Sequence, residues 1–161
     1  MTPTNPDNPT GAAVNDGPPT VAEAIERHKQ VLAEGRHVLS GLRMTQVDVD
    51  GADLAVELAL DETVTNPTGG LQGGLVATLA DIVGGRMAMV GLDEDCIVVT
   101  SDLTVHYLGP VRRGPAHAVG HILRRGTRAV VTRVDIYDGR DGPLAAACQL
   151  AFTVVRPTLR T

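Results

Sequence analysis

"NPTGGLQGGLVATLADIVGG", residues 66–85, holds six glycines and a single charged side chain, Asp81. The apolar residues that begin at Gly73 continue to Val90 and predict one long helix. The glycines at its start allow unusual backbone angles and the close approach of a ligand. A glycine-rich loop that precedes an apolar helix therefore indicates a ligand-binding site at the start of this helix.

The composition limits the class of protein. The 161 residues suit one domain, and 43% are hydrophobic but only 2% aromatic, so the core must be aliphatic. A formal net charge of −5 and the few aromatic rings argue against nucleic acid binding. No apolar run is long enough to span a membrane, and the N-terminus lacks a signal pattern. Cys96 and Cys148 show no CxxC or zinc spacing, so we expect reduced thiols, no metal site and a cytoplasmic protein.

On either side of the central segment, the chain divides into a tail, a helix and β-like runs. Residues 1–19 have little to bury, and we expect them to be disordered. Thr20 and Glu23 form a capping box that predicts a helix over 21–33. Alternating apolar residues around Asp50-Gly51 then predict a hairpin. Four more alternating runs follow the central helix, and we expect them to form a meander; they are residues 96–108, 116–125, 128–138 and 143–155.

These elements predict an α+β fold with an antiparallel sheet and one long helix to cover it, in a single domain over residues 20–161. A sheet of this size leaves apolar surface uncovered beside one main helix. We therefore expect the protein to be an oligomer.

Asp81 is the candidate reactive group. It lies about two turns into the helix, too deep to interact with the helix dipole. Its neighbours at three and four residues are all small, which leaves space beside the carboxylate; they are Ala77, Thr78, Gly84 and Gly85. The residues alone leave two interpretations open, a reactive carboxylate or a surface Asp on an amphipathic helix whose glycines serve packing. The common serine hydrolase, phosphate-binding and zinc protease motifs are missing from the sequence.

The segment 66–85 resembles the signature of hotdog-fold thioesterases of the PaaI-like, 4-hydroxybenzoyl-CoA thioesterase-related group. The resemblance continues through "VVTSDLTVHYLGPVRRG", similar to the family's next strand, and "RRGTRAVVTRVDIYDGRDGPLAAACQLAFTVV", similar to its last hairpin. It covers about residues 40–155 and implies a hotdog fold, in which a sheet wraps around one central helix.

The resemblance also implies site residues. Asp81 matches the catalytic carboxylate, which acts as nucleophile or as general base for water. Gly73 matches the residue whose backbone N–H polarises the thioester carbonyl, and Asn66 matches the loop residue that places the carbonyl or the water. Thr100 and Ser101 match hydroxyl positions that orient water and, because the family's site forms between two subunits, could serve the partner's carboxylate.

Gln72 departs from the family pattern, which has His before Gly-Gly. A Gln cannot carry a proton, but its amide can donate a hydrogen bond to a carbonyl. Gln72 could therefore stand in for an orienting His, and its presence weighs against the hotdog dehydratases and hydratases, which use a His as base.

An acid-free stretch from Val111 to Val134 carries six arginines. By charge alone it is a solvated hairpin face or a site for an anionic ligand. By resemblance, four of these side chains lie near the channel for CoA, whose phosphates pair well with arginine; they are Arg112, Arg113, Arg125 and Arg128.

The leading hypothesis is an acyl-CoA thioesterase that hydrolyses an acyl- or aryl-CoA to free acid and CoA. CoA is then part of the substrate, and no cofactor is expected. The partners expected are the acyl-CoA and further copies of the chain, as a homodimer or a dimer of dimers, with neither nucleic acid nor membrane. The alternatives are a non-catalytic acyl-CoA-binding hotdog protein and an enoyl-thioester hydratase or dehydratase.

Overall fold

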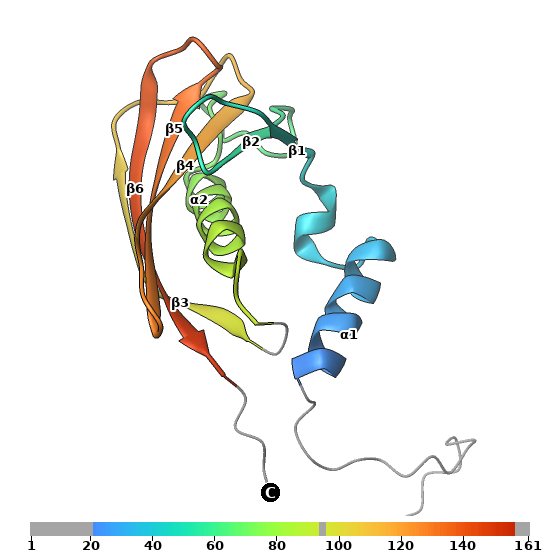
Figure 1. Ribbon diagram of the computed structural model, residues 1–161. Coiled ribbons are helices and arrows are strands. Elements are labelled where there is room, and N and C mark those ends of the chain that lie inside the picture. The colour runs from blue at the N-terminus through green and yellow to red at the C-terminus, as the bar shows by residue number, and fades with distance from the viewer. Residues whose placement is uncertain (1–20, 94–95, 157–161) are drawn as a thin grey trace, which may run out of the picture.

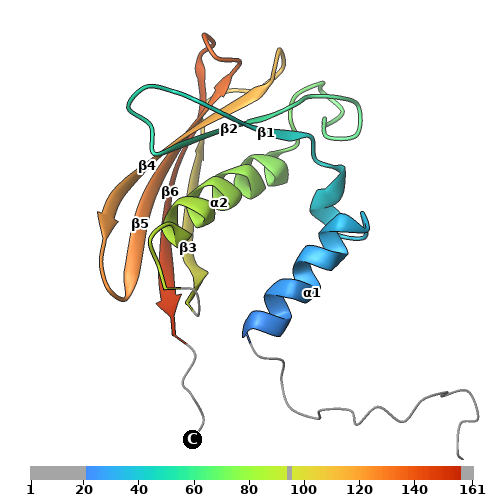
Figure 2. The same ribbon diagram turned by 45° about the vertical axis from the view of Figure 1, so that its right-hand side comes forward.

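A computed structural model of the protein describes residues 21–93 and 96–156. One antiparallel sheet and a long helix, α2, make up the body of the fold, and a second helix, α1, lies on the helix side of the sheet (Figures 1 and 2). The elements in chain order are α1 (Val21–Ala33), the 3-10 helix η1 (Val38–Gly41), β1 (Met44–Val47), β2 (Leu54–Leu58), α2 (Gly73–Met89), β3 (Ile97–Tyr107), β4 (Ala116–Arg125), β5 (Ala129–Asp138) and β6 (Leu144–Val155).

The predicted elements are nearly all present, and the central helix and α1 lie where the periodicity placed them. The hairpin is also present, with Val47 paired to Ala55 and Gly51 at φ 78°, although Val49 lies in the turn and not in the strand. The disordered tail over 1–19 and the Thr20 cap lie outside the described residues. Within the described ranges, no helix is both long and apolar enough to cross a membrane.

The strand order corrects the expected meander. The sheet runs β1-β2-β4-β5-β6-β3, so β3 pairs with the last strand, β6, and not with the next one along the chain. The pairing is antiparallel and extends from Ile97 opposite Val155 to Tyr107 opposite Ala146. Residues 108–115 therefore carry the chain from one edge of the sheet back to its middle. As a consequence β3 is an edge strand, and three of its apolar side chains are exposed: Val99, Leu103 and Tyr107.

The core lies between α2 and the concave face of the sheet (Figure 2). Leu79, Val83 and Met87 of α2 are buried in it, together with Phe152 of β6. A Cβ at Gly84 would come within 3.0 Å of the Phe152 ring and 2.9 Å of Thr132 Oγ1. Gly84 therefore allows the helix to pack closely on the one aromatic side chain of this core, which explains a glycine in the middle of a helix.

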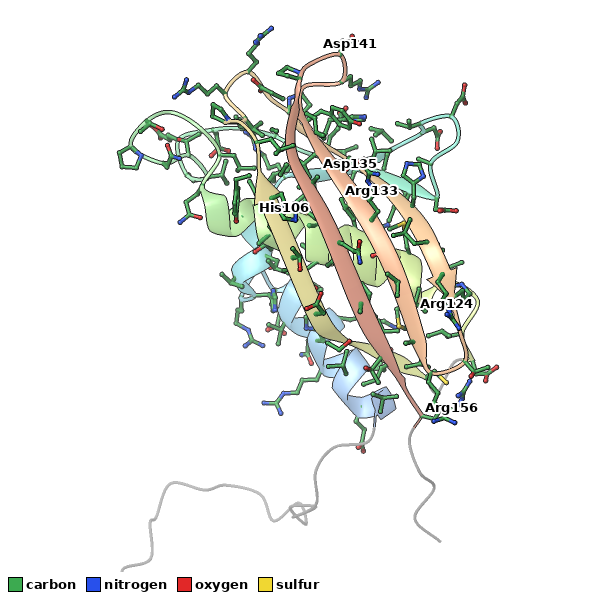
Figure 3. All side chains as sticks on the ribbon, turned by 90° about the vertical axis from the view of Figure 1, so that its left-hand side faces the viewer. His106, Arg124, Arg133, Asp135, Asp141 and Arg156 are labelled. Carbon is green, nitrogen blue, oxygen red and sulfur yellow. The ribbon has the colours of Figure 1, made fainter. Side chains whose placement is uncertain are left out.

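The opposite face of the sheet carries charged and polar side chains. His106 of β3 and the ion pair of Arg133 with Asp135 of β5 lie on it, away from α2 (Figure 3). The two faces of the sheet are thus chemically distinct, and Asp81, on α2, belongs to the helix side.

Candidate active site

The start of α2 is built by Gln72. Its backbone is extended, at φ −61° and ψ 130°, and its side-chain Oε1 accepts a hydrogen bond from Gly74 N at 2.6 Å, which makes it the N-cap. A Cβ at Gly74 would lie only 2.9 Å from this Oε1, so a side chain there would displace the cap. Among the described residues, no acceptor bonds the backbone N–H of Gly73. The helix start therefore offers one N–H and the Gln72 amide NH₂ to an incoming oxygen.

The loop before the helix is closed by Asn66. Its Oδ1 accepts hydrogen bonds from Thr68 N at 2.9 Å, from Thr68 Oγ1 at 2.7 Å and from Gly70 N at 3.2 Å. Its backbone N–H donates to Gly70 O at 2.7 Å. The Asn66 oxygen therefore holds the loop together, and any contact with substrate falls to its Nδ2 group.

Tyr107, at the end of β3, is a site residue to which the sequence analysis gave no role. Its hydroxyl donates a hydrogen bond to Gly73 O at 2.8 Å, and its ring lies 3.7 Å from the position a Gly73 Cβ would take. The side chain ties the edge strand to the first residue of α2. The only mark of it in the sequence was its place within the segment that resembles the family's next strand.

Asp81 lies in a groove at the middle of α2. Thr100 of β3 donates its hydroxyl to Asp81 Oδ1 at 2.7 Å, which fixes the carboxylate and leaves Oδ2 to act. The groove measures about 360 Å³, and seven residues line it: Leu39, Ala77, Thr78, Asp81, Ile82, Thr100 and Leu103. Most of these side chains are apolar. A half-buried carboxylate at the edge of an apolar groove is suited to attack on a bound ester or thioester.

The structure separates the two predicted hydroxyl residues. Thr100 bonds the Asp81 of its own chain, and its service to a partner's carboxylate stays a prediction. Ser101 turns away and donates to Ala151 O on β6 at 3.0 Å. The reason is a β-bulge, because the β3–β6 register shifts between Thr100 and Asp102. Ser101 is thus the extra residue of the bulge and, in this chain, does not join the site.

Comparison with known proteins adds to this geometry. A profile of the thioesterase superfamily matches residues 68–145. The human acyl-coenzyme A thioesterase 13 is 30% identical over 105 residues, which cover 65% of this chain and 74% of that protein. The chain belongs to the thioesterase superfamily. Its named relatives are thioesterases and esterases, and the chain is a thioester hydrolase.

Solved structures confirm the predicted hotdog fold. A thioesterase from Haemophilus influenzae superposes with a TM-score of 0.71 at 23% identity, over 84% of this chain and 94% of that one. A protein from Bacillus halodurans, whose crystal structure includes CoA, superposes with a TM-score of 0.62 at 28% identity, over 84% and 88% of the two chains.

The four arginines predicted to bind CoA fall into two pairs at opposite ends of this thioesterase's central helix. Arg125 donates from Nη2 to Met87 O at 2.8 Å and from Nη1 to Ala88 O at 3.1 Å. It therefore binds the carbonyls at the C-terminal end of α2, as basic side chains commonly do. This engagement gives Arg125 a structural role at the helix end, and its assignment as a phosphate ligand stays a prediction. Arg128 lies near the same end, on the turn before β5.

Arg112 and Arg113 lie instead beside the loop that opens α2. The Arg112 Cγ is 3.8 Å from the position of a Cβ on Gly70, and both arginine side chains are exposed. Their backbone N–H groups donate to Asp138 Oδ1, at 3.0 Å for Arg112 and 2.7 Å for Arg113, together with that of Gly114 at 2.9 Å. Burial raises the pKa of Asp138, but these three hydrogen bonds outweigh it and hold the pKa below its usual value. A buried carboxylate thus anchors the arginines that remain available to a ligand.

The two cysteines and the side chains that could bind a metal ion complete the description of this thioesterase. Cys96 and Cys148 are buried thiols outside any disulfide, and burial raises the pKa of Cys148 to about 11. Across residues 21–93 and 96–156, no three His, Cys, Asp or Glu side chains gather as a metal site would require.

Proposed function

We propose that the protein hydrolyses an acyl-CoA thioester to the free acid and CoA, with Asp81 as the essential carboxylate. The observation that carries the proposal is the Asp81 carboxylate, fixed at 2.7 Å by Thr100 in a mostly apolar groove. The similarity to acyl-coenzyme A thioesterase 13 and to a protein crystallised with CoA supports CoA as the carrier of the acyl group.

The reaction needs a polarised carbonyl and an attacking oxygen. The Gly73 N–H and the Gln72 amide NH₂ stabilise the negative charge that develops on the thioester oxygen. The Asp81 carboxylate attacks the carbonyl carbon itself or removes a proton from the water that does. The C–S bond then breaks, the CoA thiolate leaves and takes up a proton, and water supplies the second oxygen of the acid.

The spacing along α2 argues that each site uses two subunits. Gly73 and Asp81 are eight residues apart, which is about 12 Å along a helix. The Gly73 N–H also points out of the helix start, away from Asp81. One thioester cannot meet both groups within one chain, so the helix start of a second copy must supply the oxyanion site. The unpaired edge of β3, with Val99, Leu103 and Tyr107 exposed, is the surface we propose for that homodimer.

The direct test is a panel of acyl- and aryl-CoA substrates, with release of the free thiol as the readout. Asp81→Asn should lower kcat at least about 100-fold, because it removes both nucleophile and base, and the melting temperature should change little because Asn is nearly isosteric. The matched control is Asp141→Asn, an exposed acid in the turn between β5 and β6, which should leave kcat unchanged. Wild-type protein that binds acyl-CoA but releases no thiol from any substrate would reject the hydrolytic function. Near wild-type turnover by Asp81→Asn would reject the role of Asp81.

A further inference from the structure

The groove beside Asp81 is lined by three polar and four alkyl side chains. Thr100 and Asp81 bond each other there, at 2.7 Å. Thr78 also lines the groove, but its hydroxyl donates to Gly74 O at 2.9 Å, which satisfies its O–H within the helix. The remaining lining is alkyl and comes from three elements: Leu39 of η1, Ala77 and Ile82 of α2, and Leu103 of β3. A molecule that extends from Asp81 along this groove therefore meets hydrocarbon.

Leu39 is delivered to the groove by a short, well-defined turn. His37 is the N-cap of η1 and accepts a hydrogen bond from Leu39 N at its Nδ1, at 3.1 Å. The turn is closed at its other end by Leu42 N, which donates to Leu39 O at 3.0 Å. Within this turn Leu39 is half-buried, whereas the preceding residue, Val38, is 85% exposed. The local backbone thus selects one of two neighbouring apolar side chains to face α2.

We infer that this groove receives the acyl group as an unsubstituted aliphatic chain, and that Leu39 forms the wall that sets its length. The inference rests on the proposed thioester hydrolysis, which places the carbonyl carbon beside Asp81. The groove measures about 360 Å³ and is open to solvent, which leaves room for an alkyl chain beside Asp81. Apart from Asp81 and Thr100, the lining offers only alkyl groups and the Thr78 hydroxyl, whose O–H is already used within the helix, so the groove favours a hydrocarbon chain over a polar one.

The test is the chain-length profile of kcat/KM for straight acyl-CoA substrates from butanoyl to hexadecanoyl. Leu39→Ala should raise the ratio of kcat/KM for dodecanoyl-CoA over hexanoyl-CoA about tenfold, the scale of a small change in an apolar pocket. Leu39→Phe should lower this ratio. The matched control is Val38→Ala, in the same turn but exposed, which should leave it unchanged. Leu39→Val, a smaller truncation, repeats the test if Leu39→Ala does not fold.

A binding measurement separates this inference from the function on which it rests. Calorimetry with S-alkyl-CoA thioethers, which cannot be hydrolysed, should show the same shift in length preference for Leu39→Ala. Binding with that shift but without hydrolysis of any acyl-CoA would reject the hydrolytic function and keep the groove. Hydrolysis with a length ratio that Leu39→Ala leaves within about twofold of the wild type would overturn the role of Leu39. Equal kcat/KM for decanoyl-CoA and its ω-hydroxy derivative would overturn the unsubstituted chain.

Discussion

Replacing Gly73 by proline removes one hydrogen atom from the proposed oxyanion site and little else. Proline is favoured at the first position of a helix, where its missing N–H has no partner in the helix anyway. The residue before it must be extended, and Gln72 already is, at φ −61° and ψ 130°. A Cβ at Gly73 would meet the Tyr107 ring at 3.7 Å, which is ordinary van der Waals contact. The helix should therefore keep its start and lose only the donor.

The expected loss follows from the role of that donor. Removing one oxyanion donor typically lowers kcat about 10²–10³-fold, equivalent to about 2.7–4 kcal/mol of transition-state stabilisation. Gly73→Ala keeps the N–H and adds the same Cβ, so it is the matched control and should stay within a few-fold of the wild type. The assay is steady-state thiol release from the best acyl-CoA of the panel, with thermal unfolding measured in parallel. An unchanged kcat for Gly73→Pro would refute the reasoning, as would an equal loss for Gly73→Ala.

Mixing two inactive variants tests whether the site is shared. If Gly73 of one subunit serves Asp81 of the other, a heterodimer of Gly73→Pro and Asp81→Asn has one intact site. Random pairing makes half of the dimers mixed, each with one of two sites intact, so the mixture should recover about a quarter of the wild-type rate. If both groups act within one chain, no intact site forms. Activity that stays at the level of the parents after subunit exchange would therefore contradict the two-subunit site.

Two further predictions concern stability. Arg125→Ala should lower the free energy of unfolding by about 1–2 kcal/mol, because two carbonyls at the end of α2 each lose one hydrogen bond, and KM for acyl-CoA should stay the same. Arg128→Ala is the control for stability. A raised KM without loss of stability would favour the phosphate-binding role of Arg125. Asp138 has a lowered pKa in the folded protein, so its contribution to stability is present above its unfolded pKa of about 3.9 and is lost as pH falls through the folded pKa. Urea unfolding between about pH 6 and about pH 3 should thus show a smaller loss of stability for Asp138→Asn than for the wild type, and parallel curves would count against the Asp138 anchor.

The local pattern of the chain predicted its elements well. The apolar run after Gly73 predicted α2, and the alternation of residues 116–125 predicted β4 with the bounds that the structure has. Both signals arise from which side chains must face a core, and that requirement repeats every few residues along the chain. The small residues around Asp81 made it the candidate reactive group, and the resemblance matched it to a catalytic carboxylate; in the structure this carboxylate lies in the groove.

Only the tertiary structure decided which neighbours in the sequence work together. Thr100 and Ser101 are adjacent hydroxyls, but a bulge against β6 directs one to Asp81 and the other to Ala151. A bulge depends on the register of two strands that are distant in sequence, and no local pattern encodes it.

The acid-free run shows the same limit. Arg112 and Arg125 looked alike in the sequence, yet they lie at opposite ends of a helix about 25 Å long. The reason is that Arg112 precedes β4 and Arg125 is its last residue, so the length of the strand lies between them. Leu39 belongs to the groove only because η1 folds back toward α2, near residues about forty positions further along the chain. Composition and periodicity determined what this chain buries, whereas strand pairing and chain reversal, which are non-local, determined which groups surround Asp81.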